Sequence, residues 1–153
     1  MKGIENAQVE VEVIDRFRRP YGFLSNMAKC EVCYNGETFH SVEQAYQFAK
    51  CVTDADRDKI RRYGVRPDLA KKISHRVTVR EDWREVKLGV MEDLLRQKFS
   101  VQKLREKLLS TGSAVLIEGN EHGDYFWGQV HGVGQNMLGR LLMKIRQEKV
   151  QAA

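Results

Sequence analysis

The stretch DYFWGQVHGVGQN, residues 124–136, contains a carboxylate, bulky aromatic rings, three glycines and an amide. It directly precedes residues 138–146, whose apolar residues recur with the period of a helix. Packing alone rarely needs that mixture. Glycines let a backbone approach a ligand closely, and the N-terminus of a helix attracts anions. The stretch therefore predicts one wall of a site for a ring-bearing, phosphorylated ligand, with the last helix of the fold behind it.

The rest of the chain predicts mainly helices. Apolar periodicity and helix-start residues indicate helices over 42–51, 53–63, 67–74, 82–99, 101–109 and 138–146. Short strands are expected over 9–13, 29–34, 37–40 and 114–117, with Asn35-Gly36 as a hairpin turn. Strands and helices do not alternate regularly, so we expect an α+β domain, mainly helical with a small antiparallel sheet, and no parallel βαβ fold.

Local signals mark several helix starts and one apolar stripe. Ser41 is expected as an N-cap, Pro67 in a first turn, and Asp82 with Glu85 as a capping box. The last helix is expected to bury Leu138, Leu141, Leu142 and Ile145.

Length and composition fit one soluble globular domain, residues 1–153 with a core of about 9–149. Apolar residues make up 42% of the chain, but no run of them reaches membrane-spanning length, and the N-terminus lacks a signal-peptide pattern. Three cysteines, an odd number, fit reduced thiols in a cytoplasm. We therefore expect a cytoplasmic protein with no membrane partner.

The net charge of +5 favours anionic partners by electrostatic steering. The basic clusters at 16–19, 57–66 and 71–80 are more simply explained as solvated helix faces, and no recognised nucleic-acid-binding motif is present. A nucleic-acid-linked substrate stays possible on charge alone.

Glu43, Gln47 and Lys50 are spaced i, i+4 and i+7, so they share one face of the helix that follows Ser41. This face brings a carboxylate, an amide and an amine to the edge of the core. The simpler alternative is an exposed face with a weak Glu–Lys interaction, and spacing alone favours that alternative.

Asp124 is the second carboxylate of interest. If it converges with Glu43, one carboxylate can activate water while an oxocarbenium ion is stabilised, as glycosidic cleavage requires. Lys50 could then protonate a leaving base, or attack C1 of an opened ribose to form a Schiff base. The alternative for Asp124 is a loop aspartate that bonds its own backbone.

The two tryptophans and Asn136 also have structural interpretations. Trp83 fits a core position on a helix stripe, whereas Trp127 lies in a polar loop beside Gly128, where its ring could stack on a base. Asn136 is expected to N-cap the last helix, which does not exclude ligand contact.

No metal site or cofactor is expected. Cys30 and Cys33 form a single CxxC, which supplies too few ligands for structural zinc, and His40, His75, His122 and His131 lack metal-ligand spacing. The GxG at 132–134 follows no βαβ unit, so it does not indicate a dinucleotide site.

Four motifs occur along the chain in one family's order: Tyr21-Gly22-Phe23-Leu24-Ser25-Asn26; Ser41 to Lys50, reading SVEQAYQFAK; Arg80, Trp83, Lys87 and Met91, with Lys98-Phe99 after them; and Asp124, Trp127, Gly128, Gly132, Gly134, Asn136, Gly139, Leu142, Met143 and Arg146. On these motifs, spread from about Val13 to Arg146, the chain resembles the NADAR superfamily, the YbiA-like N-glycosidases. Met27 departs from the family pattern, which usually has Phe there. The variable loop 129–135 puts substrate choice, more than catalysis, in question.

The resemblance implies an α+β domain that hydrolyses N-glycosidic bonds without a cofactor. It implies Glu43 and Asp124 as acid/base or cation-stabilising carboxylates and Lys50 as the amine that engages ribose C1. The same motifs imply a substrate pocket made by Ser25, Asn26, Tyr46, Trp83, Trp127, Gly128 and Asn136. Arg18, which precedes the Tyr21–Asn26 motif, is our own candidate for binding phosphate.

The resemblance implies two substrate groups: phosphorylated ribosylamino-pyrimidines of the early riboflavin pathway, and ADP-ribose attached to guanine in nucleic acid. The first is the leading expectation. A non-catalytic module that binds ADP-ribose or a nucleotide would not need Glu43 with Lys50. A basic nucleic-acid-binding protein has only net charge in its favour. Oligomeric state is left open.

Overall fold

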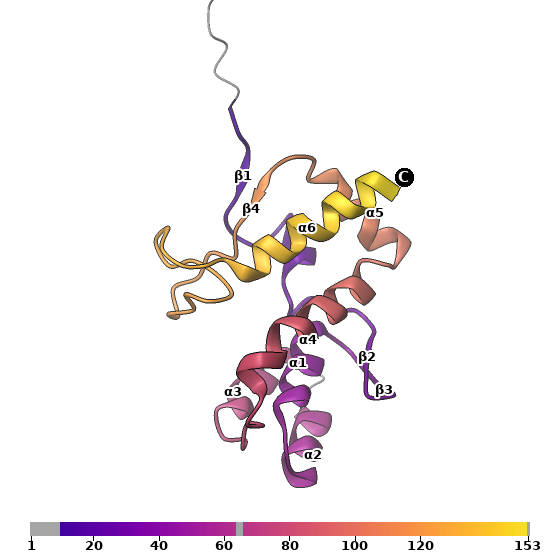
Figure 1. Ribbon diagram of the computed structural model, residues 1–153, viewed down its shortest axis with the longest axis vertical. Helices are drawn as coiled ribbons and strands as arrows, with labels where there is room; N and C mark the ends of the chain where they lie inside the picture. Colours follow the sequence, from indigo (N-terminus) through magenta and orange to yellow (C-terminus); the bar gives the residue numbers. More distant parts are fainter. Residues whose placement is uncertain (1–9, 64–65, 153) are drawn as a thin grey trace, which may run out of the picture.

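Helix α1 lies at the centre of the fold, where it contacts α2, α3, α4 and both strands of a β-hairpin. The computed structural model describes residues 10–63 and 66–152. Its elements are β1 (Val13–Ile14), the 3₁₀ turn η1 (Gly22–Leu24), β2 (Val32–Tyr34), β3 (Glu37–Phe39), α1 (Val42–Lys50), α2 (Asp54–Tyr63), α3 (Pro67–Ser74), α4 (Trp83–Lys98), α5 (Gln102–Ser110), β4 (Val115–Leu116) and α6 (Met137–Ala152). Figure 1 shows α2 at one end of the molecule and the β1–β4 pair toward the other.

Local chemistry sets the start of α1. The Ser41 side chain accepts a hydrogen bond from Gln44 N at 3.0 Å, which confirms the N-cap. Just before it, Asn35 (φ 49°) and Gly36 (φ 78°) make the tight turn between β2 and β3, which confirms the hairpin. Val42 to Ala49 are all buried, so α1 is enclosed by its neighbours on every side.

The second strand pair is parallel, which corrects the expectation of an antiparallel sheet alone. Strand β1 pairs with β4, and Ile14 is the register partner of Leu116. The strand expected over 9–13 is only Val13–Ile14 in the described residues, and its buried side chain is Ile14, whereas Val11 and Val13 are exposed. Val9 lies outside the described residues. A shift of one residue in a strand exchanges its two faces.

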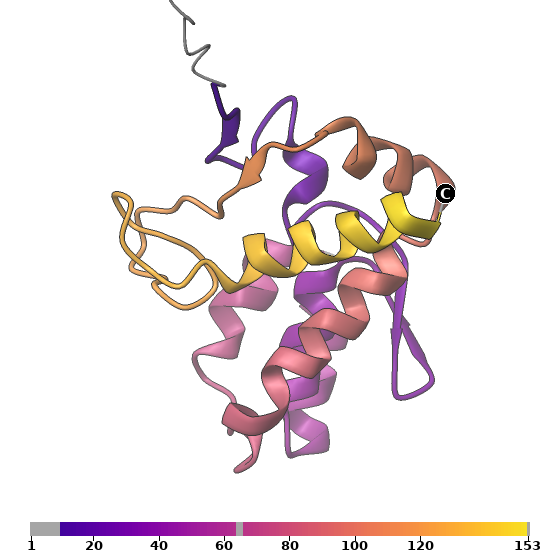
Figure 2. The same ribbon diagram turned by 45° about the horizontal axis from the view of Figure 1, so that its top comes forward.

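Helix α6 packs directly on β4, and the loop that leads into α6 forms a lobe at its N-terminal end (Figure 2). A Cβ on Gly139 would lie 2.1 Å from the carbonyl oxygen of Leu116, so only glycine permits this approach. The expected burial of Leu138, Leu141, Leu142 and Ile145 is confirmed.

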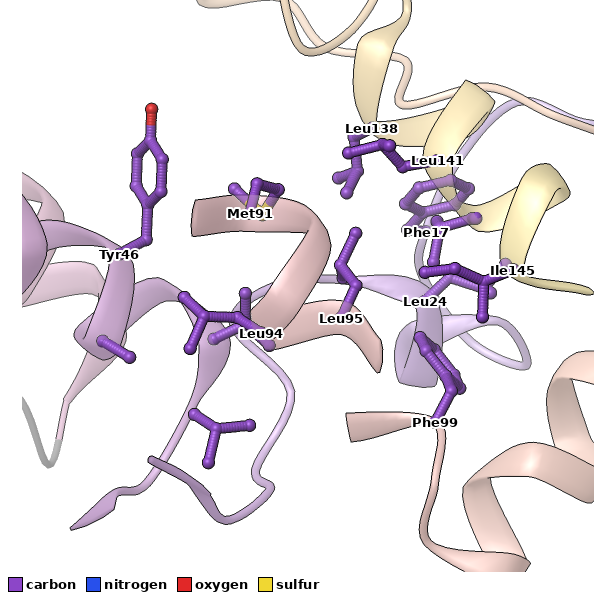
Figure 3. Close-up of a cluster of buried hydrophobic side chains, with 14 of the residues drawn as sticks. Phe17, Leu24, Tyr46, Met91, Leu94, Leu95, Phe99, Leu138, Leu141 and Ile145 are labelled. Atoms are coloured by element: carbon purple, nitrogen blue, oxygen red, sulfur yellow. The ribbon is translucent and has the colours of Figure 1, made fainter. Parts of the chain in front are cut away.

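Helix α4 joins the two halves of the core. In Figure 3 its residues Met91 and Leu95 lie between Tyr46 of α1 and the α6 side chains Leu138 and Ile145. The capping box at its start is wrong. The Asp82 side chain makes no cap hydrogen bond, because its carboxylate accepts two hydrogen bonds from the guanidinium of Arg80.

Candidate active site

A cavity of about 290 Å³ opens between α1, α3, α4 and the loop that precedes α6. We call it the reaction cavity. It is lined by Ser25, Asn26, Met27, Glu43, Tyr46, Gln47, Lys50, Lys71, Ser74, His75, Met91, Glu118, His122, Asp124, Trp127 and Leu138. The fold thus brings Glu43, Lys50 and Asp124, the three side chains predicted to carry chemistry, around one space.

The Glu43 face of α1 is turned inward. Glu43 is 8% exposed and Gln47 is 4% exposed, and Gln47 Nε2 donates to Glu43 Oε1 at 2.7 Å. The alternative of a solvated helix face is therefore wrong. Enclosure of α1 on all sides leaves even its polar residues buried, which periodicity alone could not indicate.

Lys50 ends α1 beside two aromatic rings. Its Nζ lies 5.1 Å from the ring centroid of Tyr46 and 5.9 Å from that of Trp83. Burial lowers the pKa of Lys50, while the negative charge of Glu43 works against this. Lys87 and Lys71 lower that pKa further. More of the Lys50 amine is therefore neutral than in an exposed lysine.

Asp124 is held by its own loop, which confirms the local-bonding interpretation. Asp124 Oδ1 accepts from the backbone N–H groups of Phe126 (3.2 Å) and Trp127 (2.9 Å). Asn120 bonds both the N–H and the carbonyl oxygen of Asp124. These bonds fix the carboxylate where it lines the reaction cavity.

One wall of the cavity is aromatic. Trp127 Nε1 donates to the hydroxyl of Tyr46 at 3.1 Å, and the two rings meet edge to face. Burial raises the pKa of Tyr46, so its hydroxyl stays protonated. Trp83 packs on Tyr46 with ring centroids 5.0 Å apart and does not line the cavity, which agrees with its core interpretation.

Two buried acceptors on the cavity wall lack a partner among the described residues. They are Asn26 Oδ1 and Gln47 Oε1. The Asn26 amide nitrogen is already used, because it donates to Met91 Sδ at 3.6 Å. Buried polar atoms normally find a hydrogen-bond partner, so these two oxygens are exceptions on the cavity wall.

Comparison with known proteins decides the family. The model of the NADAR domain matches residues 14–149. The chain belongs to the NADAR family. N-glycosidase YbiA of Escherichia coli (strain K12) is 36% identical to this NADAR chain over 132 residues, which cover 84% of the chain and 81% of YbiA.

Two further similarities extend this result. The NMR structure of E. coli YbiA matches with a TM-score of 0.78 at 34% identity, covering 94% of this chain and 89% of that one. This match confirms the α+β fold class. The riboflavin biosynthesis protein VVA0006 of Vibrio vulnificus is 34% identical over 134 residues, but this chain covers only 35% of its length. The NADAR chain is therefore a homologue of N-glycosidases.

Four of the expected substrate-binding residues do not line the reaction cavity: Trp83, described above, Arg18, Gly128 and Asn136. Arg18 lines a second cavity of about 780 Å³ that adjoins the first. Gly128 and Asn136 lie behind the cavity wall. The Asn136 side chain does not cap α6 as predicted, because it accepts from Glu118 N and donates to the carbonyl oxygen of Leu116. Its positive φ of 52° also differs from a helix N-cap.

Sequence reasoning missed Glu118, Lys71 and His122, which all line the reaction cavity of the NADAR domain. Lys71 Nζ lies 3.1 Å from His122 Nε2. Burial and then the negative charge of Asp124 raise the pKa of Glu118 to about 7. One signal could have found Glu118: a lone carboxylate just after the apolar stretch 114–117.

Within residues 10–63 and 66–152, no helix has the length and apolar character needed to cross a bilayer. The same residues contain no group of three or more His, Cys, Asp or Glu side chains arranged to hold a metal ion.

Proposed function

We propose that this NADAR protein hydrolyses the N-glycosidic bond of a phosphorylated ribosylamino-pyrimidine, releasing ribose 5-phosphate and the free aminopyrimidine. The observation that carries the proposal is that Glu43, Lys50 and Asp124 line one small cavity. The homology to YbiA, named an N-glycosidase, and to VVA0006, named a riboflavin biosynthesis protein, supports the reaction and the substrate class.

Acceptor atoms and an aromatic ring on the cavity wall support a ribose-containing ligand. The unpartnered oxygens of Asn26 and Gln47 would accept hydrogen bonds from ribose hydroxyls. Trp127 would cover one face of the bound ligand, its indole orientation fixed by the hydrogen bond to Tyr46. Ser25 lies at the cavity edge, and its carbonyl is held by the buried Lys98 Nζ at 2.8 Å.

The phosphate group would bind at Lys71 and His122. Both line the reaction cavity, and their side-chain nitrogens are 3.1 Å apart, so a doubly charged phosphate could contact both. His75 lines the same cavity. This assignment replaces Arg18, which lines the second cavity instead.

The bond cleavage would use Lys50 as the amine that engages C1. Its Nζ would attack C1 as the bond to the pyrimidine nitrogen breaks, and Glu43 would take the proton that the new C1–N bond releases. Asp124 would stabilise the positive charge that develops at C1. The proton held by Glu43 would then pass to the ring oxygen as the bond between C1 and that oxygen breaks, which opens the ribose and gives the imine. Water would hydrolyse the imine and return the free lysine and ribose 5-phosphate.

The test is a turnover assay by mass spectrometry on wild type, Glu43→Gln, Asp124→Asn and Lys50→Ala. Each variant should lose at least about 100-fold in turnover while its circular dichroism and melting curve stay native. Glu106→Gln is the matched control, because Glu106 is exposed on α5. Full activity in all three site variants would refute the site.

Trapping tests the covalent step separately. Borohydride added during turnover should leave the mass of a reduced ribosyl phosphate on wild type and none on Lys50→Ala. If the enzyme is active but never forms this adduct, Lys50 does not form a covalent bond to ribose and would act only as a proton donor.

The second cavity favours a second candidate substrate, ADP-ribose attached to guanine. It adjoins the reaction cavity, measures about 780 Å³ and is lined by Arg16 and Arg18, so it could hold the part of ADP-ribose beyond the first ribose. A parallel assay with ADP-ribosylated guanine DNA separates the two. Release of ADP-ribose alone would establish the second candidate, and release of ribose 5-phosphate alone the first.

A further inference from the structure

Glu118 is a carboxylate at the boundary of two cavities. It lines both the reaction cavity and the second cavity, a property that it shares with Ser25 and His122. The residue lies two positions after β4, and it is partly buried. A group placed there faces both the bond being broken and the space into which one half of the substrate can leave.

The backbone of Glu118 is fixed on both sides by close packing. Its N–H donates to Asn136 Oδ1 at 3.0 Å, and its carbonyl oxygen accepts from Gln129 N at 2.9 Å. A Cβ on Gly128 would lie 2.0 Å from that carbonyl oxygen, and one on Gly119 would lie 2.1 Å from Asp15 O. The loop before α6 therefore closes on Glu118 in a way that only glycine permits.

The Glu118 carboxyl group is also chemically free, in contrast to the other two carboxylates. Gln47 occupies one oxygen of Glu43, and two backbone N–H groups occupy one oxygen of Asp124. Glu118 makes no side-chain hydrogen bond or ion pair with any residue in 10–63 or 66–152. A proton on this group can be passed to a ligand without breaking a bond within the protein.

Its surroundings favour the protonated form. Burial is the largest cause, Asp124 and Glu43 add negative charge, and Lys71 and Lys98 oppose them. The other charged or titratable groups that line the two cavities with it are Asp15, Arg16, Arg18, Tyr46, Lys50, His75, Glu121, His122 and His131. With its pKa raised to about 7, Glu118 carries a proton in a large fraction of molecules at neutral pH.

We propose that Glu118 is the general acid of the reaction, the group that protonates the nitrogen of the departing base. The inference rests on the proposed N-glycosidase function. As the C1–N bond breaks, its electron pair goes to the nitrogen, which takes the proton from Glu118. The water that later adds at C1 gives up a proton, and that proton restores the acid. Lys50 is thereby freed to act as a neutral amine.

The experiment compares two leaving groups on wild type and Glu118→Gln. The first is the ribosylamino-pyrimidine phosphate, whose nitrogen must be protonated to leave. The second is 4-nitrophenyl riboside 5-phosphate, whose phenolate leaves unaided. Glu118→Gln should lose about 100-fold or more in kcat on the first substrate and less than about 5-fold on the second. Glu106→Gln should retain activity on both.

The pH dependence of kcat in the wild-type protein tests the role of Glu118 without any substitution. On the pyrimidine substrate kcat should fall as pH rises through about 7, because the acid loses its proton, and this limb should be absent on the nitrophenyl substrate. Equal losses on both substrates, or the same limb on both, would overturn the role of Glu118. Wild type inactive on both would instead refute the N-glycosidase function itself.

Discussion

Replacing Glu118 by Gln should make the protein more stable at alkaline pH, although it removes a proposed catalytic group. A carboxyl pKa raised from 4.5 to about 7 means that the folded protein keeps a proton which the unfolded chain has already released. Wild type therefore loses stability as pH rises from about 4.5 to about 7, and the loss is complete above that range. Glutamine has the same shape and no titration.

The size follows from the pKa change. At 1.36 kcal/mol for each pKa unit, the full cost of ionising Glu118 in the folded state is about 3 kcal/mol. Part of that cost is present already at pH 5, so the advantage of Glu118→Gln should grow by roughly 2 to 3 kcal/mol between pH 5 and pH 8. For a domain of this size it corresponds to a melting temperature about 5 to 10 °C higher at pH 8 than wild type's.

Urea unfolding of wild type and Glu118→Gln at pH 5 and pH 8 measures how the stability difference between the two proteins changes with pH. Titration of the other carboxylates cancels, since both proteins contain them. Glu106→Gln, which changes the same net charge at an exposed position, should show no comparable pH-dependent gain. An equal stability difference at the two pH values would refute the reasoning, because it would show that Glu118 ionises without cost in the folded protein.

Three further substitutions test the supports of the site. Gly128→Ala should cost at least about 2 kcal/mol of stability in a thermal melt, because its Cβ would overlap the carbonyl oxygen of Glu118. Asn136→Ala should cost about 2 to 3 kcal/mol in urea unfolding, since it removes both hydrogen bonds to the β4 segment at a residue with positive φ. Tyr46→Phe should cost about 1 to 2 kcal/mol by leaving Trp127 Nε1 unpaired, and a double-mutant cycle with Trp127→Phe should recover most of that coupling.

Most features that neighbouring residues specify were predictable, although the Asp82–Glu85 capping box does not form. The Asn35-Gly36 turn, the Ser41 cap and the start of α3 at Pro67 depend on a few adjacent side chains, and each is where the sequence places it. The parallel β1–β4 pair was not predictable, because two strands of two residues each meet about 100 residues apart in the chain. Such short strands carry almost no periodicity.

The candidate site also contains residues that local sequence could predict and residues that it could not. Glu43 and Lys50 could be found because helical spacing places them on one face, and Asp124 because it lies in an unusual loop. Glu118 had only one weak signal, its position just after the apolar stretch 114–117, because neither its burial nor its isolation is visible near it in sequence. Both arise when Gly128 and Asn136, ten and eighteen residues further on, close the loop against its backbone.

The charges around the reaction cavity support one kind of transition state. Glu43, Glu118 and Asp124 face the cavity together, and burial holds Lys50 closer to its neutral form. Burial is the largest reason why Glu118 retains its proton, and repulsion from the negative charges of Asp124 and Glu43 adds to it. A positive charge that develops at ribose C1 would relieve this repulsion, whereas the uncharged C1 of the bound substrate cannot. In the proposed mechanism, the free energy of repulsion between the carboxylates would therefore be recovered mainly in the transition state, and such a difference accelerates a reaction.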